Sequence, residues 1–316
     1  MEADNVKLHD ERELFMLMSK SLLVMAFLLL VMMTSGCDNS VGGGTELMDS
    51  GGKAENVYGS SISLEQYEEN RVELLSSVEY QVIERMTVVT DGPGEPSKQN
   101  IWMALSRDVP PYQEVVSMEI APPDYEINID EYGNQYAEFD LSDMPAGTEI
   151  PIEVKYVVRV NELSYDLSKC KGDLPEEFIQ PELHIESNNV QIKSLAEELG
   201  EGRATACEQV RAFYDHVGDN LVYSYNGGDW GAQAALGEMG ADCTEYADLM
   251  MALSRASGIP ARYTEGLYFA GEEVNPQART EHAWLDVYLP GTGWTAMDPT
   301  LGRSSQNRDE YFAHYQ

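Results

Sequence analysis

Basic residues are scarce in this sequence. The 316 residues include only 20 Lys and Arg against 55 Asp and Glu, which gives a formal net charge of −35 at pH 7. A surface of one negative sign repels phosphate backbones and anionic lipid headgroups, so the composition argues against nucleic acid and anionic membrane surfaces as ligands. The excess of acids fits two explanations equally: a surface that keeps the protein soluble, and a surface adapted to a salty environment.

Histidine and cysteine are also few, with five and four residues. The histidines are His9, His184, His216, His282 and His314. None of them forms a close pair with a second metal-binding side chain, so the sequence predicts no metal site. The acids around residues 130–134 lack the spacing of a twelve-residue calcium loop, and a solvated hairpin turn is expected there.

Only one long hydrophobic run occurs, at residues 21–33 (SLLVMAFLLLVMM). A helix needs about 20 apolar residues to span a bilayer, so this run has the length of a signal-peptide core instead. Lys20 precedes it, and the sequence TSGC, which ends at Cys37, follows. Small residues directly before a cysteine resemble the lipobox of prokaryotic lipoproteins, which implies cleavage before Cys37 and a lipid on its sulfur.

Two features depart from the lipobox pattern. Thr34 stands where leucine is usual, and the first 15 residues are acidic where basic ones are expected. Translation from Met16 or Met18 would remove the second departure. An uncleaved membrane anchor is the alternative. Both interpretations predict an extracytoplasmic, membrane-anchored protein, with a signal peptide over residues 1–36 in the lipoprotein case.

Composition divides the rest of the chain into parts. Residues 37–62 are rich in Gly and Ser and predict a flexible linker. Residues 63–165 predict a β-sandwich-like domain, with a short helix over 63–75, several alternating strands and a hairpin around 130–134. A connector with two prolines follows at 166–184, then a domain with helices and strands at 185–303 and a C-terminal tail at 304–316.

The later domain begins with helical patterns over residues 188–202 and 204–225, and a further helix is predicted from Cys243 onward. In that helix the apolar residues at helical spacing are Tyr246, Leu249, Met250 and Leu253. Asp242 suits its N-cap, and Ser257 with Gly258 suits its end. Cys243 therefore lies in the first turn, where free N–H groups and the helix dipole favour a thiolate. A buried structural cysteine is the alternative.

Residues 281–302 predict two strands joined by a Pro-Gly-Thr-Gly turn, with His282 on the first strand and Asp298 on the second. A cysteine at a helix start, a strand histidine and a strand aspartate are the residue types of a thiol triad. His282 and Asp298 must share one face of the hairpin, which requires a loop with an odd number of residues or a bulge near 289–293. Pairing of Tyr288 with Trp294 would satisfy this requirement.

Four elements in order resemble the transglutaminase-like superfamily, whose catalytic domain has a papain-like thiol fold. They are GADC at 240–243, ALSRASGIPAR at 252–262, HAW at 282–284 and WTAMDPT at 294–300. Ala241 departs from the family pattern, because a glycine is usual there. The resemblance covers about residues 185–303. It implies an α+β fold in which the cysteine helix packs on a small antiparallel sheet, and it places a catalytic triad on Cys243, His282 and Asp298.

The resemblance also implies an oxyanion hole made by the backbone N–H of Cys243 and one upstream side chain. Trp230, Tyr223 and Gln233 are the candidate donors. Trp284, beside His282, is expected to shield the triad from water. With Cys37 lipidated and Cys243 catalytic, Cys170 and Cys207 remain. An exported location permits a disulfide between them, and two free thiols are the alternative.

These observations predict an extracytoplasmic, lipid-anchored cysteine peptidase or amidase that cleaves protein or peptide amides through a thioester. The alternatives are a crosslinking protein-glutamine amine transferase and a catalytically idle binding or scaffold protein. No cofactor is required for the chemistry, although calcium remains possible because some members of the family need it. The expected partners are a protein or peptide substrate and the membrane, which is reached through the N-terminal lipid; nucleic acid is not expected.

Overall fold

The computed structural model describes residues 72–90, 98–168, 170–226, 228, 230–237, 240–268, 281–306 and 308–315, and the strand β1 (Lys7–His9). Cys37, the hydrophobic run at 21–33 and the predicted linker lie outside the described residues. β1 falls within the segment predicted as a signal peptide and pairs with β2. Within the described residues no helix is long and apolar enough to cross a membrane.

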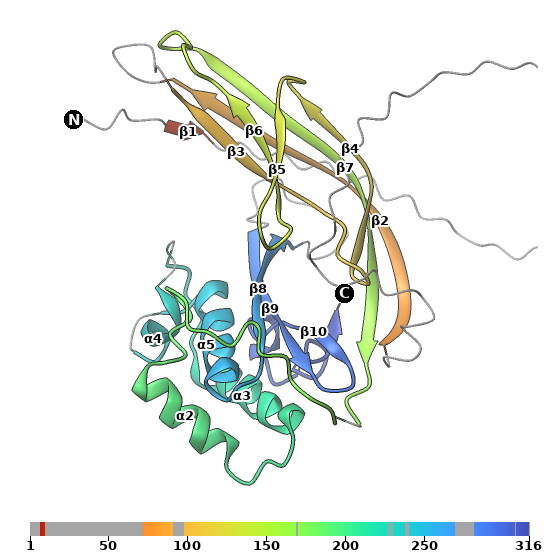
Figure 1. Ribbon diagram of the computed structural model, residues 1–316, viewed down its shortest axis with the longest axis vertical. Coiled ribbons are helices and arrows are strands. Elements are labelled where there is room, and N and C mark those ends of the chain that lie inside the picture. The colour runs from red at the N-terminus through yellow and green to blue at the C-terminus, as the bar shows by residue number, and fades with distance from the viewer. Residues whose placement is uncertain are drawn as a thin grey trace, which may run out of the picture.

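Two lobes follow one another along the chain (Figure 1). The first, which we call the β lobe, contains six strands in addition to β1. They are β2 (Val72–Val89), β3 (Asn100–Leu105), β4 (Gln113–Ala121), β5 (Glu126–Ile129), β6 (Gln135–Asp140) and β7 (Glu149–Tyr165). One sheet has the order β1-β2-β7-β11, in which β11 is His314–Tyr315 near the end of the chain, with β4 also paired to β7. The second sheet has the order β3-β6-β5.

The two sheets of the β lobe share one core. Phe139 of β6 and Val154 of β7 are fully buried in the same hydrophobic cluster. This arrangement confirms the β-sandwich-like prediction. The hairpin around residues 130–134 is also confirmed, because the Asp130 N–H donates to the Asn134 carbonyl at 3.0 Å.

Two local predictions need revision. The short helix predicted over residues 63–75 is wrong for 72–75, where the chain already belongs to β2 and pairs with β7. Long-range ladder bonds override the weak local helical pattern there. The segment predicted as a C-terminal tail contributes β11 (His314–Tyr315), which also pairs with β7.

The second lobe, which we call the helical lobe, surrounds a central helix. Its elements are α2 (Val190–Gly200), α3 (Ala206–Asn220), α4 (Gly231–Ala235), α5 (Cys243–Ala256), β8 (Ala261–Leu267), β9 (Glu281–Leu289), β10 (Gly293–Met297) and the short 3-10 helix η1 (Leu301–Arg303). Helix α5 contacts the other three helices and the sheet β10-β9-β8, and ten consecutive residues from Tyr246 to Arg255 are buried. A helix that is apolar on most sides must be covered on most sides, which explains this central position.

The β8–β10 sheet lies between α5 and the β lobe. Leu285, Val287 and Leu289 join the core around α5. Ala296 instead joins a cluster with Leu163 and Tyr165 of the β lobe. Side chains of a strand alternate between its two faces, so one sheet serves both contacts. The mixed α+β architecture is therefore the one expected from the sequence.

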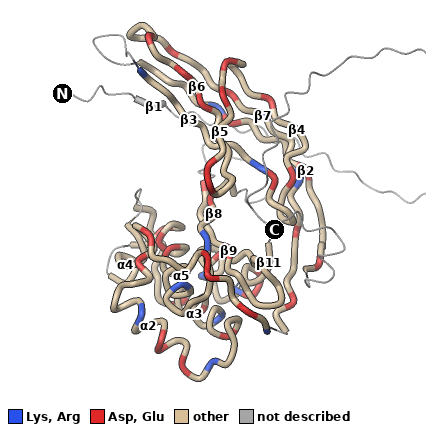
Figure 2. The backbone as a smooth tube through the Cα atoms, viewed as in Figure 1, with Lys and Arg blue, Asp and Glu red and all other residues tan. Residues whose placement is uncertain are grey.

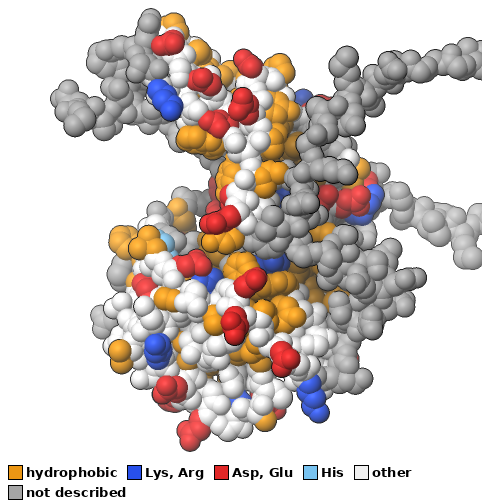
Figure 3. Space-filling model, viewed as in Figure 1, with side chains coloured by type: hydrophobic (Ala, Val, Ile, Leu, Met, Phe, Trp, Pro, Cys, Tyr) orange, Lys and Arg blue, Asp and Glu red, His pale blue; other side chains and the backbone are white. Residues whose placement is uncertain are grey.

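Acidic residues occur on both lobes, and basic residues are few on either (Figure 2). On the face seen in Figure 3, acidic side chains are scattered over both lobes, and hydrophobic side chains gather where the two lobes meet.

Candidate active site

Cys243 is the first residue of α5 and the only free cysteine among the described residues. Asp242 caps the helix by accepting a hydrogen bond from the Thr244 N–H at 3.2 Å, and the Glu245 side chain accepts from the Asp242 N–H at 2.9 Å. This reciprocal capping box fixes the first turn of the helix. The thiol of Cys243 is partly exposed at the positive end of the helix dipole.

Glu245 holds the loop before α4 against the turn that carries Cys243. Glu245 is 1% exposed, and its carboxylate also accepts hydrogen bonds from the Asn226 side chain and the Trp230 N–H, both at 2.9 Å. The Asn226 side chain reaches the Gly240 carbonyl at 3.3 Å as well. Sequence reasoning missed Asn226 and Glu245. The spacing of Asp242 and Glu245 is the capping-box pattern, so Glu245 could have been found.

His282 and Asp298 meet across the β9–β10 hairpin. The His282 Nε2 lies 2.6 Å from the Asp298 Oδ2, and both side chains are mostly buried, at 11% and 14% exposure. The ladder pairs Leu289 with Gly293 and Tyr288 with Trp294, which leaves a three-residue loop. The predicted odd loop and the predicted Tyr288–Trp294 pair are both confirmed, and this register puts the imidazole and the carboxylate on one face.

Asp298 is itself fixed by the residues around it. Its second carboxylate oxygen accepts from the Leu301 N–H at 2.9 Å, and its backbone carbonyl accepts from the Tyr214 hydroxyl at 2.9 Å. Gly302 has no room for a larger residue, because a Cβ there would lie 1.8 Å from the Tyr214 hydroxyl oxygen. Helix α3 and η1 therefore hold the carboxylate in place for His282.

The surroundings of His282 favour its charged form. Burial of the ring lowers its pKa, but hydrogen bonds with Asp298 and with Cys243 outweigh burial and raise the pKa to about 9. Nε2 is taken by Asp298, so the bond with Cys243 falls to Nδ1, the other ring nitrogen. The Tyr268 ring and the Trp284 ring flank the imidazole, with centroids 5.4 Å and 6.0 Å away. Trp284 thus lies where a shield from water is expected.

The three candidate oxyanion donors have different positions. Trp230 is about half exposed beside Gly228, and its backbone N–H is bonded to Glu245. Tyr223 pairs through its backbone with Ala241, and its ring lies against Tyr246. Trp230 and Tyr223 therefore both flank the turn before Cys243. Gln233 is exposed on α4, and its backbone N–H donates to Glu186, so it belongs to a different edge of the lobe.

Cys170 and Cys207 form a disulfide, which is the pairing expected from an exported location. It ties the connector after β7 to the first turn of α3. Cys243 takes no part in the bridge and remains a thiol.

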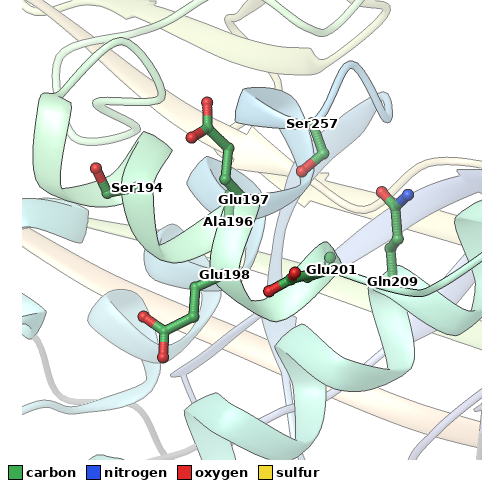
Figure 4. Close-up of a pocket in the computed structure, with 8 residues that line it drawn as sticks. Ser194, Ala196, Glu197, Glu198, Glu201, Gln209 and Ser257 are labelled. Atoms are coloured by element: carbon green, nitrogen blue, oxygen red, sulfur yellow. The ribbon is translucent and has the colours of Figure 1, made fainter.

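A pocket of about 610 Å³ lies at the other end of α5 (Figure 4). It is lined by Ser194, Ala196, Glu197, Glu198, Gly200, Glu201, Gln209 and Ser257. Ser257 caps the C-terminus of α5, and a helix of this length separates it from Cys243 by about 20 Å. The pocket is therefore separate from the Cys243–His282–Asp298 cluster. Among the described residues, no group of three or more His, Cys, Asp or Glu side chains could hold a metal ion.

Comparison with known proteins places this cluster in a family context. Residues 193–299 match the family model of the transglutaminase-like superfamily. The chain is 26% identical to a protein-glutamine gamma-glutamyltransferase of Pseudomonas aeruginosa over 172 residues, which is 51% of this chain and 25% of that protein. It is also 26% identical to the uncharacterised protein YebA of Bacillus subtilis over 166 residues, which is 47% of this chain and 21% of that protein. The chain thus spans a quarter or less of these curated relatives.

One solved structure shares the fold over most of the chain. It is a protein of Cytophaga hutchinsonii that is provisionally named a cysteine protease, with a TM-score of 0.56 and 20% identity. The superposition covers 72% of this chain and 78% of that one, so the likeness extends over both lobes.

Proposed function

We propose that the protein is a thiol enzyme that breaks protein or peptide amide bonds, on the premise that residues 193–299 match the family model of the transglutaminase-like superfamily. The observation that carries the proposal is the 2.6 Å contact of His282 with Asp298, together with the hydrogen bond of the same imidazole with Cys243. His282 thus contacts both the candidate nucleophile Cys243 and the carboxylate of Asp298, which is the arrangement that acyl transfer through a covalent intermediate requires.

The proposed reaction uses the charge state of His282. With a pKa of about 9 the imidazole carries its proton at neutral pH, and the imidazolium stabilises a thiolate on Cys243. The sulfur attacks the amide carbonyl and forms a tetrahedral intermediate. The intermediate collapses when His282 gives its proton to the departing amine, which leaves a thioester on Cys243. Neutral His282 then activates the second nucleophile, and Asp298 keeps the ring oriented through both steps.

Water and a substrate amine compete for the thioester. Water is present at about 55 M and wins unless the site excludes it, so we propose hydrolysis as the main outcome, in an enzyme of the peptidase or amidase class. Transfer to an amine is the second candidate, since a relative that matches half of this chain is named a protein-glutamine gamma-glutamyltransferase. The proposed chemistry needs no metal or other cofactor, and a calcium requirement would contradict this part of the proposal.

One assay separates the two outcomes and tests the nucleophile. The full chain is incubated with a glutamine-containing donor protein and a labelled primary amine, and ammonia release, new amino termini and amine incorporation are measured together. New amino termini or ammonia without incorporation support hydrolysis, and incorporation supports transfer. Cys243→Ala should abolish all these signals, whereas the matched variant Cys37→Ala should retain them. If Cys243→Ala keeps full activity, the proposed nucleophile is wrong. No activity on any amide, with an unreactive Cys243, would favour a binding or scaffold protein.

We also propose that the protein works outside the cytoplasm and is anchored through a lipid on Cys37. The Cys170–Cys207 disulfide supports an oxidising compartment, and the apolar run before Cys37 supports export. Metabolic labelling with a radioactive fatty acid tests the anchor. The label should enter the wild type and the Cys243→Ala variant and be lost in Cys37→Ala.

A further inference from the structure

Arg303 lies beside the turn that carries Cys243. Its guanidinium carbon is 4.9 Å from the centroid of the Tyr223 ring, and the Tyr223 ring lies 6.3 Å from that of Tyr246. Tyr246 is three residues after Cys243 on α5, and the Tyr223 backbone pairs with Ala241, two residues before it. The guanidinium therefore lies over a residue that pairs directly with the turn leading into Cys243.

The position of Arg303 is also coupled to Asp298. Arg303 ends η1, and the first residue of η1, Leu301, donates its N–H to the Asp298 carboxylate at 2.9 Å. Arg303 Nη1 donates to the Thr300 carbonyl at 2.5 Å. Arg303 is thus anchored from both sides of the active site: from the Asp298 side through its backbone, and from the Cys243 side through Tyr223.

Arg303 differs from most described arginines in its partners. Six arginines form ion pairs with Asp or Glu: Arg85, Arg159, Arg211, Arg255, Arg262 and Arg308. Arg303 contacts a carbonyl and an aromatic ring, and within the described part of the chain it forms no ion pair. The side chain is exposed to solvent. Near the turn that carries Cys243, an arginine without a carboxylate partner among the described residues retains its binding capacity for a carboxylate from outside, although the chain has 55 acids.

We propose that Arg303, supported on Tyr223, binds a carboxylate of the substrate and so selects peptides with an acidic group close to the reactive amide. The inference rests on the proposed function, because it assigns specificity to the same site. A planar guanidinium with one N–H already used still offers a pair of parallel donors to a carboxylate. The acidic remainder of the surface repels anions, so a second cation beside the charged His282 favours binding of an anionic group at this site.

The test uses two reagents that differ in charge alone and needs no known substrate. Iodoacetate and iodoacetamide both alkylate a thiolate, forming an S–C bond as iodide leaves, but only iodoacetate carries a carboxylate. Alkylation rates of Cys243 in the full chain are measured by peptide mass spectrometry and normalised to those of mercaptoethanol. We expect Arg303 to contribute about tenfold to the normalised preference for iodoacetate, which is the factor of one charge-assisted hydrogen bond, in addition to the share that the His282 imidazolium contributes.

Variants assign the preference to one side chain. Arg303→Gln should lower the preference about tenfold and leave the share due to the His282 imidazolium, and Arg303→Lys should retain part of the Arg303 contribution. Arg203→Gln removes the same charge at the loop between α2 and α3, where Arg203 is exposed, and should change nothing. If Cys243 reacts with both reagents without any preference, or if Arg303→Gln keeps the full wild-type preference, the carboxylate site is wrong while the nucleophile stands. If neither reagent modifies Cys243, the inference and the proposed function both fail.

Discussion

Acidic residues near the two ends of helix α5 lie in opposite environments. At the N-terminal end Glu245 is 1% exposed and accepts hydrogen bonds from Asp242, Asn226 and Trp230. At the C-terminal end Glu197, Glu198 and Glu201 line an open pocket and are exposed. In a protein with a net charge of −35, a carboxylate becomes structurally important where hydrogen-bond donors converge on it, and not where acids gather.

The largest expected effect comes from the carboxylate that orients His282. Asp298→Ala removes the acceptor of the His282 Nε2–H, so the imidazolium loses both its charged partner and its orientation. We expect kcat/KM to fall by about 10³–10⁴, the order of loss when the carboxylate of a triad is removed. Amide turnover is measured alongside urea unfolding. A fall in activity with unchanged unfolding supports the assigned role; a variant with full activity would remove Asp298 from the mechanism.

The next effect tests the N-terminal end of α5. Glu245→Gln brings an NH₂ group into a site where every neighbour donates, so at least one backbone or side-chain N–H loses its acceptor. We expect a loss of about 3 kcal/mol in the free energy of unfolding, since breaking a buried charged network is costly. Urea unfolding measures it. A loss below about 0.5 kcal/mol would mean that the network is not needed to hold the turn before Cys243.

The same comparison explains which features of the structure could be predicted from the sequence. Helix α5 was predictable because Asp242, the apolar spacing and Gly258 all act locally, and the register of β9 and β10 followed from the requirement that His282 and Asp298 share a face. Both are properties of neighbouring residues or of a single hairpin. The capping box of Glu245 is also a local pattern of the sequence, because Glu245 follows Asp242 by three residues.

Other features depend on contacts between distant segments. Asn226 reaches the turn before Cys243 only because residues 222–226 run alongside 240–242, and Arg303 meets Tyr223 across 80 residues of chain. The start of β2 was mistaken for a helix because its pairing with β7 lies far along the chain. No local sequence pattern indicates such pairs, so the residues that hold the site in place, such as Asn226, were harder to predict than the candidate triad.

A smaller effect should appear as a dependence of stability on pH. The pKa of His282 is about 9 in the folded protein, above its unfolded value of about 6.5. Its contribution is therefore fully present below pH 6.5 and is lost as the pH rises to 9 and beyond. We expect the stability difference between the wild type and His282→Gln to shrink by on the order of 2 kcal/mol across this window. Urea unfolding of both proteins from pH 6 to 9.5 measures it; a difference that grows with pH would have the wrong sign for this environment.

The smallest effect belongs to the C-terminal end of α5 and its pocket. Glu197 is exposed in the last turn of α2, where no basic residue offsets the negative end of the helix dipole. Two more acids, Glu198 and Glu201, line the same pocket. Glu197→Gln should therefore stabilise the protein slightly, by about 0.3 kcal/mol at low salt, and the gain should shrink as salt screens the charges. Activity should stay at the wild-type level. Urea unfolding at low and high salt measures the change in the free energy of unfolding. A destabilised variant would contradict this prediction and would mean that the Glu197 carboxylate, like that of Glu245, accepts a stabilising hydrogen bond.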